Sequence, residues 1–320
     1  MRVFIAGATG VLGKRLVAEF SEHGYSVVGL TRDVRGDEIV ESRGGEPRRG
    51  DLFDEASIVD AARGADIIIH AATAIPTDSP TPEAWERNDR VRTDGARALV
   101  RAANEVGAEQ LLQQSIVWVA RQPDGSSYDE QSHTHPESWT QSALDAELIA
   151  QDGGEEYGFD VTVLRCGYFY APDSYYTRAD GAGIVDGERP IIDGTDDVAL
   201  SYLHVDDAAS AFRAATDHSL SGLYHVVDDT PVSDAEFVST LARKLGSTRP
   251  DGVSTETASA AMGEITVDLF THPMATTNDA FKAETDWEPQ FPSCTEGLAQ
   301  VVNEWETEGY LIDSPQVDID

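Results

Sequence analysis

The chain has 320 residues, 40% of them hydrophobic, and a formal net charge of −35 from 58 acidic and 23 basic residues. A chain this acidic is repelled by the phosphates of nucleic acids and by anionic membranes, which excludes both as partners. It is long enough to bury a substantial core, as one large domain or two medium ones.

The acidic residues are spread along the whole chain, and only three residues are lysines. Excess surface carboxylate with little lysine is typical of proteins that work in concentrated salt, because salt screens the self-repulsion. We interpret the chain as halophilic; the alternative is an ordinary acidic cytosolic protein. The chain opens on the strand-like MRVFIAG, without the long apolar region of a signal peptide, and no later stretch approaches the ~18 apolar residues of a membrane span. We expect a cytoplasmic protein.

Short apolar runs alternate with amphipathic stretches through the first half of the chain. Six strands are expected: residues 3–7, 26–32, a short third strand directly before Asp51, then 66–72, 110–117 and 161–165. Two long helices are expected near 89–106 and 138–157. Uninterrupted apolar strands, each followed by a helical pattern, indicate a parallel sheet covered on both faces. The fold class is therefore α/β, with a doubly wound parallel sheet of the Rossmann type.

After Pro172 the sequence becomes irregular and rich in Gly and Asp, with short strands expected at 200–205 and 223–227. We interpret residues 1–170 as a dinucleotide-binding domain and residues 171–320 as a smaller substrate-binding portion, with segments around 200–230 returning to the first domain. Asp206 and Asp207 are expected to cap the helix that follows them. Residues 311–320 are expected to be a loose tail.

The first strand runs into GATGVLG, which places Gly7, Gly10 and Gly13 at a spacing that opens a helix. Glycines there allow a tight turn and let backbone N–H groups face a pyrophosphate. We therefore expect this turn, including Thr9 and the Val11–Leu12 pair, to bind a dinucleotide.

The end of the second strand selects the dinucleotide, because an acidic side chain there accepts from a ribose hydroxyl whereas an arginine neutralises a 2′-phosphate. Thr31, Arg32 and Arg35 stand at this point, which favours NADP, while Asp33 keeps NAD possible. Further cofactor contacts are expected after the third and fourth strands, at Asp51, Leu52, Ala71, Ala72 and Thr73. His70 is either a packed histidine at the end of its strand or a catalytic one.

These segments together resemble the extended short-chain dehydrogenase/reductase superfamily, which includes sugar-nucleotide epimerases and dehydratases. The likeness is carried by GATGVLG, GDL, HAA, LVRAANEVG, LRCGYFYAP, YLHVDDAASAF and WEPQFPSCTEGL, and covers most of the chain. The resemblance implies a catalytic triad of Ser or Thr, Tyr and Lys, in which the tyrosine exchanges the proton and the lysine lowers its pKa. It also implies a homodimer formed through the two long helices.

Ser115 matches the first member of the triad, but the tyrosine and lysine positions are occupied by Trp139 and Ala143. The residues four positions before the three lysines are Gly10, Thr240 and Asn278, so no Tyr-x-x-x-Lys sequence exists in the chain. An indole N–H donates a hydrogen bond but releases no proton at accessible pH, so Trp139 does not replace the tyrosine.

Another proton donor is therefore needed, and Tyr168, which follows the sixth strand, is the first candidate. Arg92 is a second departure, because relatives usually have an asparagine there. We predict an NAD(P)-dependent oxidoreductase acting on a carbonyl or alcohol of a small polar substrate, with catalytic Ser115 and Tyr168, NADP as cofactor and no metal. The alternatives are a nucleotide-sugar epimerase or dehydratase, and a non-catalytic NAD(P)-binding sensor or scaffold.

Overall fold

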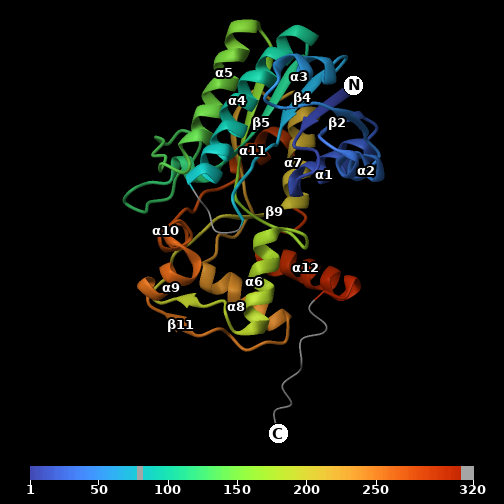
Figure 1. Ribbon diagram of the computed structural model, residues 1–320. Coiled ribbons are helices and arrows are strands. Elements are labelled where there is room, and N and C mark those ends of the chain that lie inside the picture. The colour runs from blue at the N-terminus through green and yellow to red at the C-terminus, as the bar shows by residue number, and fades with distance from the viewer. Residues whose placement is uncertain (78–81, 311–320) are drawn as a thin grey trace.

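A seven-stranded sheet organises the computed structural model, which describes residues 1–77 and 82–310 (Figure 1). The tail expected over residues 311–320 lies outside the described residues. Every neighbouring pair of strands in this sheet is parallel, in the order β10-β6-β5-β4-β1-β2-β3. The strands are β1 (Arg2–Ala6), β2 (Ser26–Thr31), β3 (Glu46–Arg49), β4 (Ile67–His70), β5 (Gln110–Ile116), β6 (Asp160–Cys166) and β10 (Gly222–Val226). The doubly wound α/β fold expected from the sequence is confirmed.

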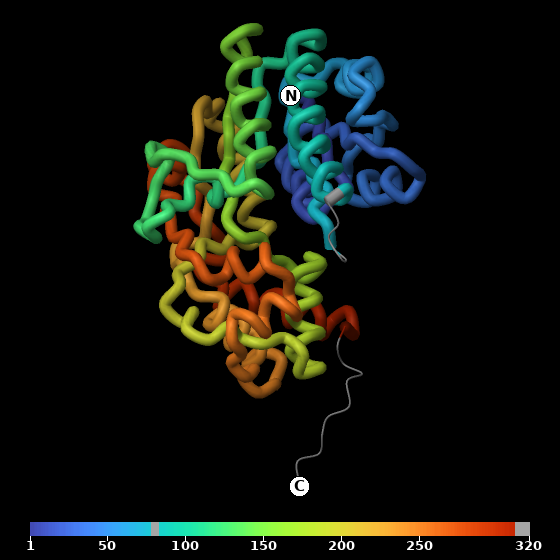
Figure 2. Tube along the Cα trace, turned by 60° about the vertical axis from the view of Figure 1, so that its left-hand side comes forward, coloured from blue at the N-terminus to red at the C-terminus, as the bar shows by residue number. Residues whose placement is uncertain are grey.

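Helices cover both faces of the sheet, as the alternation along β1 shows. Val3 and Ile5 pack with α1 and α7, whereas Phe4 and Ala6 pack with α3, α4 and α5, because successive side chains of a strand point to opposite faces. The bounds are α1 (Val11–Glu22), α2 (Val34–Ser42), α3 (Glu55–Ala61), α4 (Pro82–Val106), α5 (Gln141–Tyr157) and α7 (Val205–Asp217). The long helices α4 and α5 lie side by side along one face (Figure 2). Among the described residues, no helix has the length and apolar character needed to cross a membrane.

A smaller portion occupies the lower half of Figure 1. Its elements are β7 (Tyr168–Tyr170), α6 (Tyr175–Asp186), β8 (Ile191–Ile192), β9 (Tyr202–His204), α8 (Asp234–Lys244), β11 (Gly252–Val253), α9 (Thr255–Met262), α10 (Glu264–Thr271) and α12 (Cys294–Glu308). Helix α11 (Asp279–Thr285) lies in the upper half, where it packs against β10 of the large sheet. Strand β9 pairs with β7 outside the large sheet. Helix α7 and strand β10, which follow β9, pack with the large sheet.

The expectation that Asp206 and Asp207 cap α7 was wrong. The cap is His204, whose Nδ1 accepts a hydrogen bond from the backbone N–H of Asp206 at 3.2 Å. Burial lowers the pKa of His204 to about 4, so its imidazole is neutral and able to accept. The carboxylate of Asp206 instead pairs with Arg15, and that of Asp207 accepts from the backbone N–H groups of Gln290 and Phe291 at 2.6 and 3.0 Å.

A buried ion pair joins α5 to the centre of the sheet. Arg165 of β6 donates two hydrogen bonds to the carboxylate of Glu147 on α5, at 2.9 and 2.7 Å, and Ser115 of β5 donates a third. The three residues are at most 3% exposed. Two charges removed from water are tolerated only when each satisfies the other, so this contact fixes α5 against β5 and β6.

We predict that Arg165→Met lowers the free energy of unfolding by about 3–5 kcal/mol, because Glu147 is left as an unpaired buried charge. The measurement is urea denaturation followed by circular dichroism. Arg63→Met is the matched control, since Arg63 pairs with Asp60 at the surface, where both side chains are 74% exposed. An Arg165→Met protein as stable as the control would show that the buried pair contributes no net stability.

Candidate functional site: the glycine turn and the aromatic wall beside it

The turn between β1 and α1 presses against the end of β4. Gly7 has a φ of 90°, and a Cβ on it would lie 2.6 Å from backbone atoms of Ala71 and Ala72. A Cβ on Gly13 would overlap the carbonyl oxygen of Gly7. Only glycine fits at either position, so the motif is required by the close approach of two backbone segments.

The start of α1 is open to an anion. Gly10 is its N-cap, no described side chain caps it, and its first turn contains no acidic residue. Thr9 and Gly10 are exposed, and Val11 and Leu12 begin the helix with backbone N–H groups that have no partner within it. A glycine cradle closed by Ala71 and Ala72, followed by an uncapped helix N-terminus, fits the pyrophosphate of a dinucleotide.

Two free cations lie at the end of β2. Arg32 and Arg35 are exposed, and neither forms an ion pair or hydrogen bond with any residue that the structure describes. The nearby acids are engaged, because Asp33 caps α2 through the N–H of Gly36 at 2.8 Å and Asp37 accepts from Thr31 at 2.6 Å. This edge therefore offers unneutralised positive charge.

The remaining expected cofactor residues follow the neighbouring strands. Asp51 is exposed after β3 and accepts from the N–H of Phe53 at 3.0 Å, and Leu52 packs against the core beside it. Thr73 is exposed after β4. The topology brings these positions to the same carboxyl edge as the glycine turn, where ligands bind in open α/β sheets.

His70, at the end of β4, is packed in the interior. Its side chain is 1% exposed, and its Nδ1 lies 2.9 Å from Oε1 of Gln113. Burial lowers its pKa to about 4. A Cβ on Gly95 would lie 3.0 Å from His70 Nε2, so a glycine on α4 makes room for the imidazole.

The two positions where the dyad is missing are apolar. Ala143 is 3% exposed and packs with Ile116 and Val119, and Trp139 is half-buried with its ring 6.5 Å from that of Trp118. Arg92 lies between α4 and α5 and donates to Ser142 at 3.3 Å. Burial lowers the pKa of Arg92 to about 10.

Ser115 and Tyr168, the expected catalytic pair, differ in their freedom to act. The hydroxyl of Ser115 is buried and already donates to Glu147. Tyr168 is partly exposed, with its ring 6.0 Å from Trp118 and 5.7 Å from Phe270, yet burial of the phenol raises its pKa well above the ordinary value. Their catalytic roles stay predictions.

Tyr170, two residues further on, is fully buried and donates to Asp228 at 3.1 Å. It is therefore a packing residue. Sequence reasoning missed two features, the Glu147–Arg165 pair and Trp118, which stands beside Trp139 and Tyr168. The only sequence signal for Trp118 is its position, three residues after Ser115, just past the end of β5.

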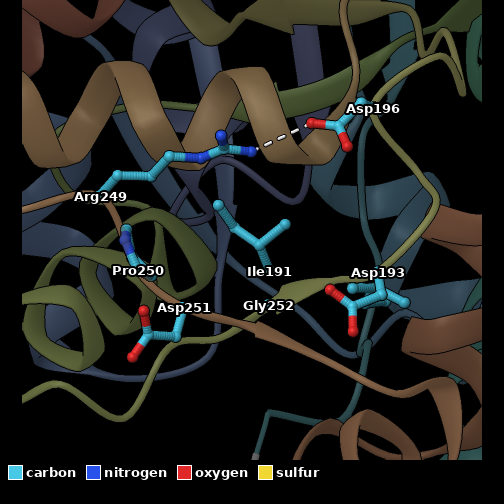
Figure 3. A pocket seen from close by; sticks show the side chains of 8 residues that line it. Ile191, Asp193, Asp196, Arg249, Pro250, Asp251 and Gly252 are labelled. Carbon is cyan, nitrogen blue, oxygen red and sulfur yellow. Dashed lines mark hydrogen bonds and ion pairs between the residues drawn. The ribbon is translucent and has the colours of Figure 1, made fainter.

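A surface hollow lies away from this edge, in the smaller portion between β8 and β11 (Figure 3). Ile191, Asp193, Asp196, Arg249 and Asp251 are among the residues that line it, and Arg249 donates to Asp196 at 3.0 Å across it. It shares no residue with the glycine turn. No cluster that could hold a metal ion occurs within residues 1–77 and 82–310.

The sequence model of the NAD dependent epimerase/dehydratase family matches residues 3–226, which include the glycine turn and all seven strands of the large sheet except the first residue of β1. The chain belongs to this family. It is 32% identical over 315 residues to a 3-diazoavenalumate denitrifying reductase from a Streptomyces species, covering 94% of this chain and 100% of the relative.

A second relative is a 4-hydroxy-2-methyl-3-oxo-4-farnesyl-3,4-dihydroquinoline-1-oxide ketoreductase from Stigmatella aurantiaca, 24% identical over 77% of this chain and 74% of the relative. Among solved structures, dTDP-glucose 4,6-dehydratase from Streptomyces venezuelae with NAD bound has a TM-score of 0.79 at 20% identity, covering 97% of this chain and 98% of that one. A human epimerase family protein with NADPH also has a TM-score of 0.79, at 16% identity, covering 95% and 99%. The two structures share the fold.

We predict that Gly7→Ala weakens NADPH binding at least about tenfold, because its Cβ would force the turn away from Ala71. The measurement is a titration of NADPH fluorescence. Gly158→Ala is the control, since Gly158 also has a positive φ of 83° but has nothing within 4 Å of its Cβ position. Equal affinity of the two variants, at equal thermal stability, would contradict the assignment of the turn to the cofactor.

Proposed function

We propose that the protein is an NAD(P)H-dependent reductase that uses NADP(H) and acts on a small polar substrate. The observation that carries the proposal is the contact of Gly7 with Ala71 and Ala72, next to the uncapped start of α1. When bound, the dinucleotide supplies the hydride. The glycine turn would hold its pyrophosphate, and the ends of β5 and β6 would face the acceptor.

The preference for NADP is supported by the free charge at the end of β2. Arg32 and Arg35 have no partner among the described residues, whereas Arg49, close by, is paired with Asp37 at 2.7 Å. Because the chain contains more than twice as many acids as bases, leaving two arginines unpaired at this point favours an anionic ligand group such as a 2′-phosphate.

We predict that the double variant Arg32→Ala, Arg35→Ala lowers affinity for NADPH by about tenfold or more, while affinity for NADH changes little. Both affinities are measured by fluorescence titration at several salt concentrations. Arg63→Ala serves as the control for loss of an exposed arginine. Parallel losses for both dinucleotides would refute the proposed 2′-phosphate contact.

Two kinds of hydride acceptor differ in whether the reaction also needs a proton. A carbonyl takes a hydride at carbon and a proton at oxygen, and the proposal assigns that proton to Tyr168. Ser115 would polarise the oxygen only after its hydroxyl, which donates to Glu147, has turned away from that carboxylate. Tyr168 is partly exposed at the carboxyl edge of the sheet, which supports its role as the proton donor. Its raised pKa makes it a weaker acid, which counts against it.

The second candidate acceptor needs no proton. An aryl diazonium group takes a hydride at carbon and releases N₂, so neither a tyrosine nor a lysine is required. The apolar packing of Ala143 against Ile116 and Val119 favours this candidate, because nothing at that position would lower the pKa of a phenol. The full-length similarity to a denitrifying reductase of a diazo compound supports it further.

We predict that Tyr168→Phe distinguishes the two acceptors. If Tyr168 protonates a carbonyl, the rate of the variant with an aromatic aldehyde falls about 10²–10⁴-fold, whereas Tyr157→Phe, at the exposed far end of α5, keeps the rate. If the acceptor is a diazonium ion, Tyr168→Phe and the unmodified protein reduce a benzenediazonium salt equally fast. The measurement is NADPH absorbance in low and high salt, with N₂ release as a second readout.

Tight NADPH binding without oxidation across aldehydes, ketones, diazonium salts and nucleotide sugars would instead favour a non-catalytic sensor or scaffold. Turnover of a nucleotide sugar alone would favour an epimerase or dehydratase. A homodimer through α4 and α5, which sedimentation would test, completes the proposal.

A further inference from the structure

Three aromatic side chains from separate elements form a continuous wall at the carboxyl edge of the sheet, which we call the aromatic wall. Trp118 lies on the 3₁₀ turn η1 (Val117–Ala120) that follows β5, Trp139 precedes α5, and Tyr168 begins β7 after β6. The ring centroids of Trp118 lie 6.5 Å from Trp139 and 6.0 Å from Tyr168. All three side chains are partly exposed, so their free surfaces are open to a ligand.

The wall contains an unsatisfied donor. The indole Nε1 of Trp118 is shielded from solvent and has no hydrogen-bond partner among the described residues. A buried donor without an acceptor costs free energy. Eleven other buried side-chain N or O atoms of the described residues also lack a hydrogen-bond partner, but Trp118 Nε1 is the one that belongs to the aromatic wall. A ligand oxygen placed against the wall would supply the missing acceptor.

The position of the wall relates it to the cofactor turn. Strand β1 lies between β4 and β2, so a dinucleotide that crosses the sheet at Gly7 extends toward β2 in one direction and toward β4, β5 and β6 in the other. Arg32 and Arg35 occupy the first direction. The wall follows β5 and β6, in the second direction, where the reacting group of the substrate must lie.

We infer that the wall binds a planar aromatic substrate that carries a hydrogen-bond acceptor, with an oxygen of the substrate accepting from Trp118 Nε1. Aromatic rings favour offset-stacked and edge-to-face contacts with one another, and the three rings of the wall already meet in tilted and T-shaped contacts of this kind, which a further aromatic ring could extend. This inference rests on the proposed reductase function and names its substrate class.

A sugar fits the wall less well. Its hydroxyl groups need several polar partners, whereas the three side chains carry only two indole nitrogens and one phenol oxygen. Two arginines of the smaller portion are already paired and so cannot hold a charged carrier: Arg189 pairs with Asp180 and Asp234, and Arg178 pairs with Glu308.

The test is a comparison of 4-hydroxybenzaldehyde with its saturated analogue 4-hydroxycyclohexanecarbaldehyde. Binding of each to the NADP⁺-loaded protein is measured by calorimetry, which requires no turnover. We expect the aromatic probe to bind at least about tenfold more tightly than the saturated one. Trp118→Phe keeps a ring but removes the N–H, and we expect it to weaken binding of the aromatic probe about tenfold with NADPH affinity unchanged.

Tyr157→Phe is the control, because Tyr157 is an exposed ring at the far end of α5. Near-ultraviolet circular dichroism shows whether Trp118→Phe keeps the native packing. Equal affinity for the two probes, or an unchanged affinity in a folded Trp118→Phe protein, would overturn the inference. Absence of NADPH binding to the unmodified protein would refute the proposed reductase function instead. Failure of the inferred substrate class is therefore distinguishable from failure of the proposed function.

Discussion

The ion pair between Glu147 and Arg165 is the contact on which the geometry of the site depends. It joins α5, β5 and β6 in the interior, since Ser115 of β5 donates to the same carboxylate. Trp139 precedes Glu147 by eight residues, about two helical turns, so fixing Glu147 also fixes how closely the start of α5 approaches the sheet. The strand ends that carry Trp118 and Tyr168 are held by the same contact.

This constraint has a chemical consequence. The guanidinium of Arg165 donates to Glu147 through Nε and one terminal nitrogen, and the hydroxyl of Ser115 donates to the same carboxylate. The start of α5 then presents Ala143 to Ile116 and Val119 and presents Trp139 to Trp118. In this chain the positions expected to hold the proton-exchanging tyrosine and lysine form an apolar and aromatic surface instead. A reaction at such a surface would either take its proton from Tyr168 or take none.

The glycine turn and the end of β2, the two parts of the dinucleotide site, are positioned independently of the Glu147–Arg165 pair. The glycine turn is shaped by backbone contact, because Gly7 meets Ala71 and Ala72, and it does not depend on side-chain chemistry. The end of β2, which carries Arg32 and Arg35, is separate from both the glycine turn and the ion pair. Cofactor binding and catalysis therefore rely on different contacts, and a chain can keep the first while the second changes.

The sequence by itself determined the parallel sheet, the glycine turn and the absence of a Tyr-x-x-x-Lys dyad. These follow from local rules, since apolar runs such as IIIH favour a sheet covered on both faces, and since a spacing that does not occur in the sequence is absent from any fold of it. Only the tertiary structure decided which residue caps α7, that Ser115 donates to a buried carboxylate, and that Trp118, Trp139 and Tyr168 share one wall. The serine and aromatic contacts join residues 21 to 50 positions apart. His204 is the cap because α7 begins at Val205, before both aspartates, which bind Arg15 and the backbone of Gln290, 191 and 83 positions away. The periodicity and spacing of the sequence do not predict contacts between such distant residues, because tertiary packing decides which of them meet.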